Sequence, residues 1–155
     1  MPNSHFDNPK NSLILYGLDK DFDFFTKLYL ANKTPKVLML SGEKGIGKST
    51  LINHLMNFIF DKSNYNFKDK RIDSKSLFYK QYSNKTFSNI IYLSGSMFKN
   101  VKIEDIRELK KKLLKSTLSN KERFIILDDV ELFNSNSLNA LLKVIEEPTD
   151  NNFFI

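Results

Sequence analysis

Cysteine and tryptophan are absent from this sequence, and glycine and proline are scarce, with five and four residues among 155. The lack of cysteine excludes a disulfide framework. With His5 and His54 as the two histidines, it also leaves no credible zinc site. No apolar run has the length of a membrane span, and the amino terminus lacks the basic start and apolar stretch of a secretion signal. These absences predict a cytoplasmic protein with no membrane segment.

The composition is that of a globular protein, with 41% hydrophobic and 27% charged residues, and the length suits one domain. The net charge of +6 favours a polyanionic neighbour, because lysines attract phosphate backbones. Lysine, asparagine, isoleucine and phenylalanine are abundant together, so AT-rich coding is the alternative explanation. Charge alone therefore decides little about function.

Apolar spacing predicts both helices and strands along the chain. Helical spacing marks residues 19–30, the segment after residue 48, residues 102–118, and a segment that stops at Pro148. Short apolar runs predict strands at 36–40, 90–95, 123–129 and 151–155, the first buried on both faces. Strands that alternate with helices predict an α/β fold, a parallel sheet flanked by helices.

The same spacing predicts which side chains face inward. In the two later helices these are Ile103, Ile106, Leu109, Leu113 and Leu114, and then Leu138, Leu141, Leu142 and Ile145. His54 falls on another face of its helix and is expected at the surface. Residues 1–12 read as a polar leader, and residues 13–155 as the domain, with a polar and partly helical insert at 61–89.

Three of the five glycines lie within six residues, in the pattern Gly42-x-x-x-x-Gly47-Lys48-Ser49 between a predicted strand and a predicted helix. This is the pattern of a phosphate-binding loop, in which backbone amides surround a triphosphate and the helix dipole adds positive charge. Lys48 would reach the β- and γ-phosphates of ATP, and the Ser49 hydroxyl would bind Mg²⁺. A chance glycine turn is the alternative. The predicted ATP-binding residues are Gly42, Glu43, Lys44, Gly45, Ile46, Gly47, Lys48, Ser49 and Thr50.

Two aspartates follow the apolar run 124–127. A phosphate-binding loop needs a second carboxylate for its metal, delivered from the end of a neighbouring strand, so Asp128 is the predicted Mg²⁺ ligand. Taken alone, paired aspartates after a strand more often form a helix cap or a turn. Asp129 takes the position of a catalytic base. Many such enzymes have glutamate there, so the shorter Asp129 predicts slow hydrolysis or hydrolysis that needs help.

The segment 127–155, LDDVELFNSNSLNALLKVIEEPTDNNFFI, resembles the second nucleotide-site motif and following helix of bacterial DNA polymerase III clamp-loader subunits. Residues 139–148 match the family's near-fixed NALLK-hydrophobic-hydrophobic-EEP segment. The resemblance extends back through residues 38–51 and 103–116 to the leading segment, where Leu15 and Tyr16 match the family's segment near the adenine.

Within that family the chain is most similar to the delta-prime subunit. The gamma/tau subunits usually carry a four-cysteine zinc module between the loop and the second strand, and an Asp-Glu pair. This chain has a cysteine-free insert and Asp128-Asp129 instead. The resemblance therefore implies retained ATP binding with doubtful turnover, and gamma/tau is the alternative type.

The resemblance further implies an AAA+ P-loop ATPase module in a hetero-pentameric ring, with the other clamp-loader subunits, the sliding clamp and primed DNA as partners. In AAA+ domains the fourth strand lies between the phosphate-loop strand and the Asp-bearing strand. The sequence stops within that strand, before the family's sensor, arginine finger, lid and collar, so an incomplete domain and an amino-terminal fragment are expected.

Two other classes of function stay open at this point. One is a self-sufficient P-loop enzyme, such as a nucleotide kinase or a DNA-repair ATPase. The other is a basic nucleic-acid-binding module with a vestigial loop. The insert favours the latter weakly, because it interleaves aromatic and basic residues that could stack on and pair with single-stranded DNA; a locally packed insert is the alternative. These residues are Tyr65, Phe67, Phe78, Tyr79, Tyr82, Phe87, Lys68, Lys70, Arg71, Lys75, Lys80 and Lys85.

Overall fold

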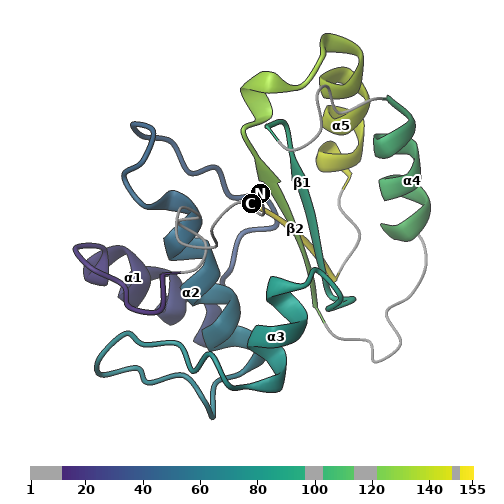
Figure 1. Cartoon of the computed structure of the whole chain (residues 1–155). Coiled ribbons are helices and arrows are strands. Elements are labelled where there is room, and N and C mark those ends of the chain that lie inside the picture. Colours follow the sequence, from purple (N-terminus) through teal and green to yellow (C-terminus); the bar gives the residue numbers. More distant parts are fainter. Residues whose placement is uncertain (1–11, 97–102, 114–121, 148–150) are drawn as a thin grey trace, which may run out of the picture. The chain divides into compact units, whose positions relative to one another are not determined.

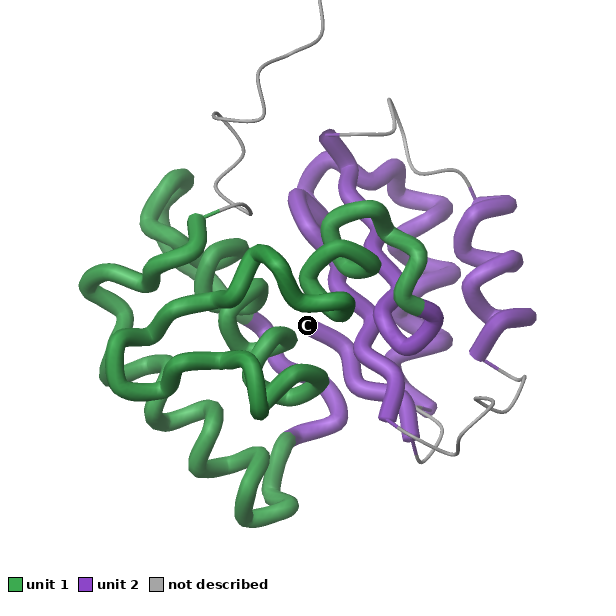
Figure 2. The backbone as a smooth tube through the Cα atoms, turned by 60° about the horizontal axis from the view of Figure 1, so that its bottom comes forward, with its two compact units in different colours: residues 1–34, 40–87 green, residues 35–39, 88–155 purple. Residues whose placement is uncertain are grey.

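A computed structural model gives the structure of the chain and describes residues 12–96, 103–113, 122–147 and 151–155. The elements follow one another as α1, α2, α3, β1, α4, β2, the 3₁₀ helix η3, α5 and β3 (Figure 1). The chain forms two compact units, with residues 1–34 and 40–87 in unit 1 and residues 35–39 and 88–155 in unit 2 (Figure 2). None of the described helices is long and apolar enough to cross a membrane.

A parallel sheet forms the centre of unit 2. Its strands are β1 (Ile90–Ser94), β2 (Arg123–Asp128) and β3 (Asn152–Phe154), in the order β1-β2-β3. The pairing places Ile90 beside Phe124 and Ser94 beside Asp128. All three strands coincide with predicted apolar runs, and the α/β prediction is confirmed.

Residues 36–38 extend this sheet beyond β3. Val37 forms a parallel bridge with Phe154, whose N–H donates to the Lys36 carbonyl at 2.8 Å and whose carbonyl accepts from the Leu38 N–H at 2.8 Å. β3 therefore lies between β2 and the segment before the loop, as the family resemblance implied. The predicted burial on both faces is wrong, because Val37 is 43% and Met39 82% exposed. Side chains alternate along an extended segment, and here one of its two faces is open.

Two helices pack against the sheet of unit 2. They are α4 (Ile103–Leu113) and α5 (Ser135–Glu146), the latter preceded by η3 (Val130–Leu132). The Asn134 side chain caps α5 by accepting from the Ser137 N–H at 2.8 Å. The core between helices and sheet is built from Ile106, Leu109, Leu113, Ile125, Phe133, Leu141 and Phe154.

The inward faces of these helices follow the predicted spacing with one error. Leu138 and Ile145 pack against the buried core, whereas Leu142 is 53% exposed. Positions 138, 141 and 145 are three and four residues apart and share one stripe; position 142 follows 141 by about 100° of rotation and leaves that stripe. Leu114 lies outside the described residues.

Unit 1 is built on helices α1 (Asp19–Leu30), α2 (Lys48–Phe60) and α3 (Leu77–Ser83). Its core consists of Leu15, Phe22, Leu51, Phe58, Tyr65 and Ile72. Phe22 is fully buried and lies 6.0 Å from the Phe58 ring and 5.4 Å from the Tyr65 ring, between ring centroids. Aromatic packing between α1, α2 and the segment after α2 therefore holds this unit together.

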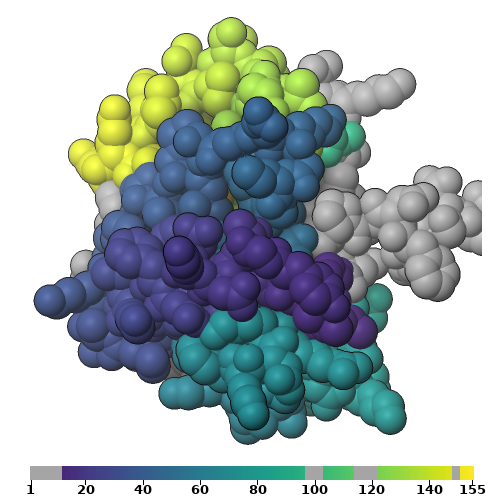
Figure 3. Space-filling model, turned by 90° about the vertical axis from the view of Figure 1, so that its left-hand side faces the viewer, coloured from purple at the N-terminus to yellow at the C-terminus, as the bar shows by residue number. Residues whose placement is uncertain are grey.

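The segment 61–89 packs onto the rest of unit 1, and residues 12–30 and 61–83 lie side by side on one face (Figure 3). Ile14 forms an antiparallel bridge with Arg71. The buried Lys70 ammonium pairs with Asp23 at 2.5 Å and lies 3.7 Å from the Phe67 ring centroid. Tyr65 and Phe78 are buried as well. These contacts favour a locally packed insert over an aromatic platform for DNA.

The predicted surface position of His54 is wrong. His54 is fully buried in unit 1, where its Nε2 donates to the Ser12 carbonyl at 3.1 Å and its Nδ1 accepts from the Tyr65 hydroxyl at 2.9 Å. Every residue from Leu51 to Phe58 is buried, so α2 has no exposed face in this stretch. Helical periodicity predicts an exposed face correctly only when one side of the helix is in contact with solvent.

Burial lowers the pKa of His54 from 6.5 to about 4, and the hydrogen bond with Ser12 opposes that shift. Because the unfolded chain binds a proton near pH 6.5 and the folded chain resists it, stability is full above that pH. We expect the free energy of unfolding to fall by about 2 to 3 kcal/mol between pH 6.5 and pH 4. Urea unfolding across this range measures the loss. His54→Gln, which does not titrate, should lose less than the natural chain, and equal losses would contradict the assignment.

Candidate functional site

The glycine-rich loop has a backbone that glycine makes possible. Gly42, Gly45 and Gly47 have φ angles of 150°, 89° and 102°. Gly47 is the left-handed cap at which α2 begins, and a Cβ there would meet the Leu18 side chain at 2.9 Å. The loop therefore turns sharply into a helix amino terminus, where backbone N–H groups lack helical partners.

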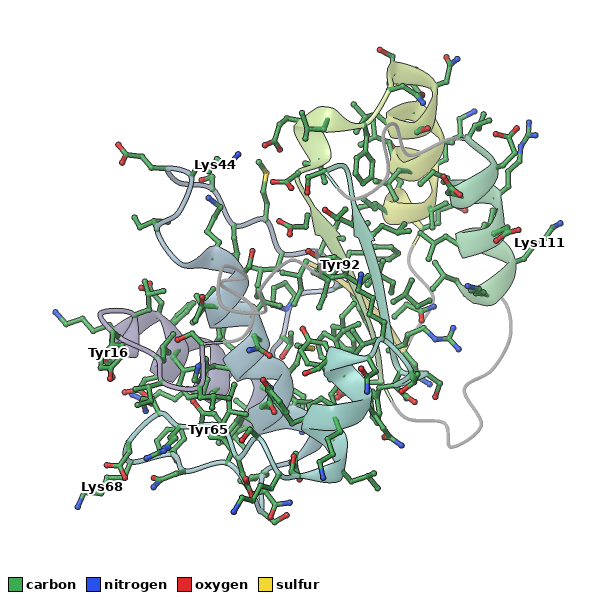
Figure 4. All side chains as sticks on the ribbon, viewed as in Figure 1. Tyr16, Lys44, Tyr65, Lys68, Tyr92 and Lys111 are labelled. Atoms are coloured by element: carbon green, nitrogen blue, oxygen red, sulfur yellow. The ribbon has the colours of Figure 1, made fainter. Side chains whose placement is uncertain are left out.

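The Lys48 side chain folds back over this loop. Its Nζ donates to the carbonyl of Gly42 at 2.8 Å and to that of Glu43 at 2.9 Å. Ser49 and Thr50 follow in the first turn of α2, while residues 41–46 are exposed. Lys44, at the outer edge of the loop, is also exposed (Figure 4). The Lys48 ammonium group thus lies against the backbone of the loop, while residues 41–46 stay exposed to solvent.

The segment before α1 adds one exposed aromatic ring to unit 1. Leu15 is buried in the core, whereas Tyr16 is 77% exposed (Figure 4). Gly17, with φ 74°, turns the chain between them and α1. Of the two residues that resemble the family's adenine segment, Tyr16 alone is available to a ligand.

In unit 2, Asp128 lies at the carboxyl end of β2 and is held from β1. The Tyr92 hydroxyl donates to Asp128 Oδ2, and the Gly95 N–H donates to the Asp128 carbonyl at 3.0 Å. Sequence reasoning missed both partners. Tyr92 is one of many aromatic residues in the chain, and only the register of β1 against β2 brings it to Asp128.

Asp129 has a left-handed backbone, with φ 52° and ψ 47°, and it caps η3. Its carbonyl presses so closely on Gly95 that a Cβ there would collide with it and would lie 2.7 Å from Leu132 Cβ. Aspartate and asparagine tolerate this conformation better than longer side chains do. The backbone at this position therefore suits an aspartate.

The structure distributes the predicted site residues between the two units. The nine loop residues are together in unit 1, and Asp128 and Asp129 are together in unit 2. Within the described residues, no group of three or more His, Cys, Asp or Glu side chains could hold a metal ion. Any metal would therefore need ligands besides a cluster of protein carboxylates.

A groove of about 320 Å³ lies between α4 and α5 of unit 2. Apolar side chains such as Ile106 and Val144 line it together with Arg107, Lys110 and Lys143. It contains none of the predicted site residues. Lys110 thus lines the groove, whereas Lys111 and Lys112 are exposed and lie outside it.

The close contact of Gly95 with Asp129 generates a stability prediction. Gly95→Ala places a methyl group against the Asp129 carbonyl and Leu132, and such overpacking destabilises proteins by about 1–3 kcal/mol. Thermal or urea unfolding measures the change. Lys111→Ala, on the exposed face of α4, is the control and should stay within about 0.5 kcal/mol of the natural chain. Equal stability of both variants would show that the Gly95 contact relaxes at no cost.

Comparison with known proteins matches residues 18–155 to the family described as "DNA polymerase III, delta subunit". The uncharacterized protein L666 of Acanthamoeba polyphaga mimivirus is 33% identical over 136 residues, which are 86% of this chain and 51% of that protein. DNA polymerase III subunit gamma of Buchnera aphidicola subsp. Acyrthosiphon pisum (strain APS) is 26% identical over 117 residues, 76% of this chain and 31% of that protein. The chain thus spans about half, or less, of the length of these relatives.

The family match includes both parts of the candidate site, because it runs from Leu18 through the loop of unit 1 and the aspartate pair of unit 2 to Ile155. It covers far more than half of the chain, and it agrees with the resemblance of residues 139–148 to DNA polymerase III clamp-loader subunits. The chain belongs to the DNA polymerase III delta subunit family.

Proposed function

We propose that this chain is an ATP-binding, delta-prime-type subunit of the DNA polymerase III clamp loader. The observation that carries the proposal is the glycine loop, with three positive φ angles, a helix amino terminus behind it and Lys48 folded over it, in a chain of this family. The proposed partners are the other clamp-loader subunits, the sliding clamp and primed DNA, in the cytoplasm. The proposed work is to hold the ring and contribute to a neighbouring site while the clamp is loaded.

The geometry of the loop supports ATP as its ligand. A triphosphate needs several N–H donors that converge on one point, and a turn into a helix amino terminus provides them. Lys48 donates to two loop carbonyls, and an incoming phosphate offers the same ammonium a charged acceptor. A Cβ added to Gly45 would meet no residue beyond its chain neighbours within 4 Å, so the rim of the loop is accessible.

The donor set also suits Mg²⁺. This ion takes oxygen ligands and usually binds one or two protein groups together with phosphates and waters, so a cluster of three carboxylates is not needed. Ser49 and Asp128 would supply a hydroxyl and a carboxylate, and the bound ion would neutralise phosphate charge. Segment 36–39 and β2 run parallel within the sheet of unit 2, so Met39 and Asp128 leave it at the same edge.

Weak hydrolysis fits the environment of Asp129. A base that activates water needs a side chain of the right reach, and aspartate is one methylene shorter than the glutamate of many P-loop enzymes. The left-handed backbone at Asp129 suits an aspartate, which adopts this region more often than most residues do. We therefore propose that Asp129 is a poor base and that nucleotide binding, rather than turnover, is the main property of this subunit.

The assignment to the delta-prime type rests on two features of the chain. The segment 61–89 has no cysteine and so cannot form the zinc module of gamma/tau subunits, and Asp128-Asp129 replaces their Asp-Glu pair. One relative is named subunit gamma, which makes the gamma/tau type the alternative.

Lys48→Ala tests the proposal. Loss of a charge-assisted contact with phosphate should weaken ATP binding by at least about tenfold, as measured by titrating the full chain with a fluorescent ATP analogue. Lys111→Ala removes an exposed lysine from α4, outside the predicted site, and should bind nearly as the natural chain does. Equal affinities of the natural chain and Lys48→Ala, or no binding at all, would overturn the proposal.

Hydrolysis by the full chain separates the proposal from a self-sufficient P-loop enzyme. We expect ATP binding without sustained phosphate release, because Asp129 is poorly suited to activate water. Release of inorganic phosphate under saturating ATP and Mg²⁺ is the measurement, with Asp129→Asn as the matched variant. Sustained release that Asp129→Asn abolishes would favour the self-sufficient enzyme.

A further inference from the structure

Tyr92 and Asp128 belong to neighbouring strands whose pairing is known residue by residue. Tyr92 lies beside Ile126, and Ser94 lies beside Asp128. Side chains two positions apart on a strand share a face, so Tyr92 and Asp128 are diagonal neighbours on one face of the sheet. A tyrosine is long enough to span that diagonal, and its hydroxyl donates to Asp128 Oδ2.

The backbone of Asp128 is held from the same strand. The Gly95 N–H donates to the Asp128 carbonyl at 3.0 Å, and the absence of a side chain at Gly95 permits the close approach of the next carbonyl. β1 and the residue after it thus contact both the main chain and the carboxylate of Asp128. A residue held both at its main chain and at one carboxylate oxygen keeps one side-chain orientation, whereas a carboxylate without such a contact rotates about χ2.

The chemistry of this contact suits a metal ligand better than it suits packing alone. The Tyr92 ring is half-buried, and a phenylalanine would fill the same volume without the hydroxyl. The hydroxyl is a donor, and a donor to one carboxylate oxygen fixes the orientation of the whole carboxylate group. Groups that orient a metal-binding carboxylate commonly change metal affinity by about 10–100-fold when removed.

We propose that Tyr92 is a positioning residue that orients the Asp128 carboxylate for Mg²⁺. The inference rests on the proposed function, since it assigns a role within that same ATP·Mg²⁺ site. It adds a residue of β1 to the residues of unit 2 that would hold the ion. Tyr92 touches neither the nucleotide nor the ion in this account and acts through Asp128.

Tyr92→Phe in the full chain tests the inference. The chain has no tryptophan, so a fluorescent ATP analogue can be titrated without tryptophan background. Affinity is measured first in EDTA and then across a Mg²⁺ titration of the nucleotide-bound protein. We expect the Mg²⁺ concentration at half-saturation to rise about tenfold, while the affinity in EDTA and the melting temperature stay close to those of the natural chain.

Three variants keep the possible outcomes apart. Tyr79→Phe removes a tyrosine hydroxyl from unit 1 and should leave the Mg²⁺ titration unchanged. Asp128→Asn should raise the half-saturation at least as much as Tyr92→Phe. Lys48→Ala should weaken binding in EDTA as well, because its contact with phosphate needs no metal.

Each result counts for or against the inference. An unchanged Mg²⁺ titration in Tyr92→Phe, with a shifted one in Asp128→Asn, overturns the role of Tyr92 and leaves the proposed function standing. An unchanged titration in Asp128→Asn overturns the metal role of both residues. A loss of affinity in EDTA or a large drop in melting temperature for Tyr92→Phe shows a structural role and overturns the inference. No nucleotide binding by the natural chain overturns the proposed function itself.

Discussion

The main-chain hydrogen bonds of β3 are the constraint on which unit 2 depends. The Ile155 N–H donates to the Ile125 carbonyl at 2.9 Å, and Phe154 bonds to both Lys36 and Leu38 on its other side. Because all of these segments run parallel, their carboxyl ends meet at one edge of the sheet, which is where polar side chains of α/β proteins gather around ligands. β3 joins the segment that leads into the glycine loop to β2, and this pairing aligns Met39 with the edge that bears Asp128.

Much of the fold could be predicted from the sequence, because most of its signals are local. The run 123–128 is apolar and continuous, and α1 has the predicted bounds, since its apolar spacing changes abruptly at both ends. The errors arise where burial depends on distant parts of the chain. His54 is buried because Tyr65 and Ser12 close over α2, and periodicity within α2 contains no information about either. Met39 is exposed because one face of its segment is not covered by other residues. An apolar run in the sequence does not show which parts of the chain cover each of its faces.

In the candidate site, too, local signals could be predicted from the sequence and contacts between distant segments could not. The loop residues could be predicted because glycine spacing encodes the positive φ angles themselves, and Gly42, Gly45 and Gly47 all have them. Asp128 could be predicted because it ends an apolar strand. Tyr92 and Gly95 could not, because their importance comes from the register between β1 and β2, which places one beside the carboxylate and the other against the main chain. Register is a property of two segments that lie some thirty residues apart in the sequence, and it cannot be predicted from either segment alone.

The proposed ATP binding and the proposed weak hydrolysis would depend on different physical features of this chain. Binding of a triphosphate would use main-chain amides, Lys48 and an oriented carboxylate. The main-chain amides are present whatever the neighbouring side chains are. Hydrolysis would use the side chain at position 129, whose backbone is left-handed and whose carbonyl presses on Gly95. The contact between Gly95 and Asp129 links the backbone at that position to the residue after β1, because the Asp129 carbonyl leaves no room for a side chain at Gly95. The position of the proposed base therefore depends on β1 as well as on β2.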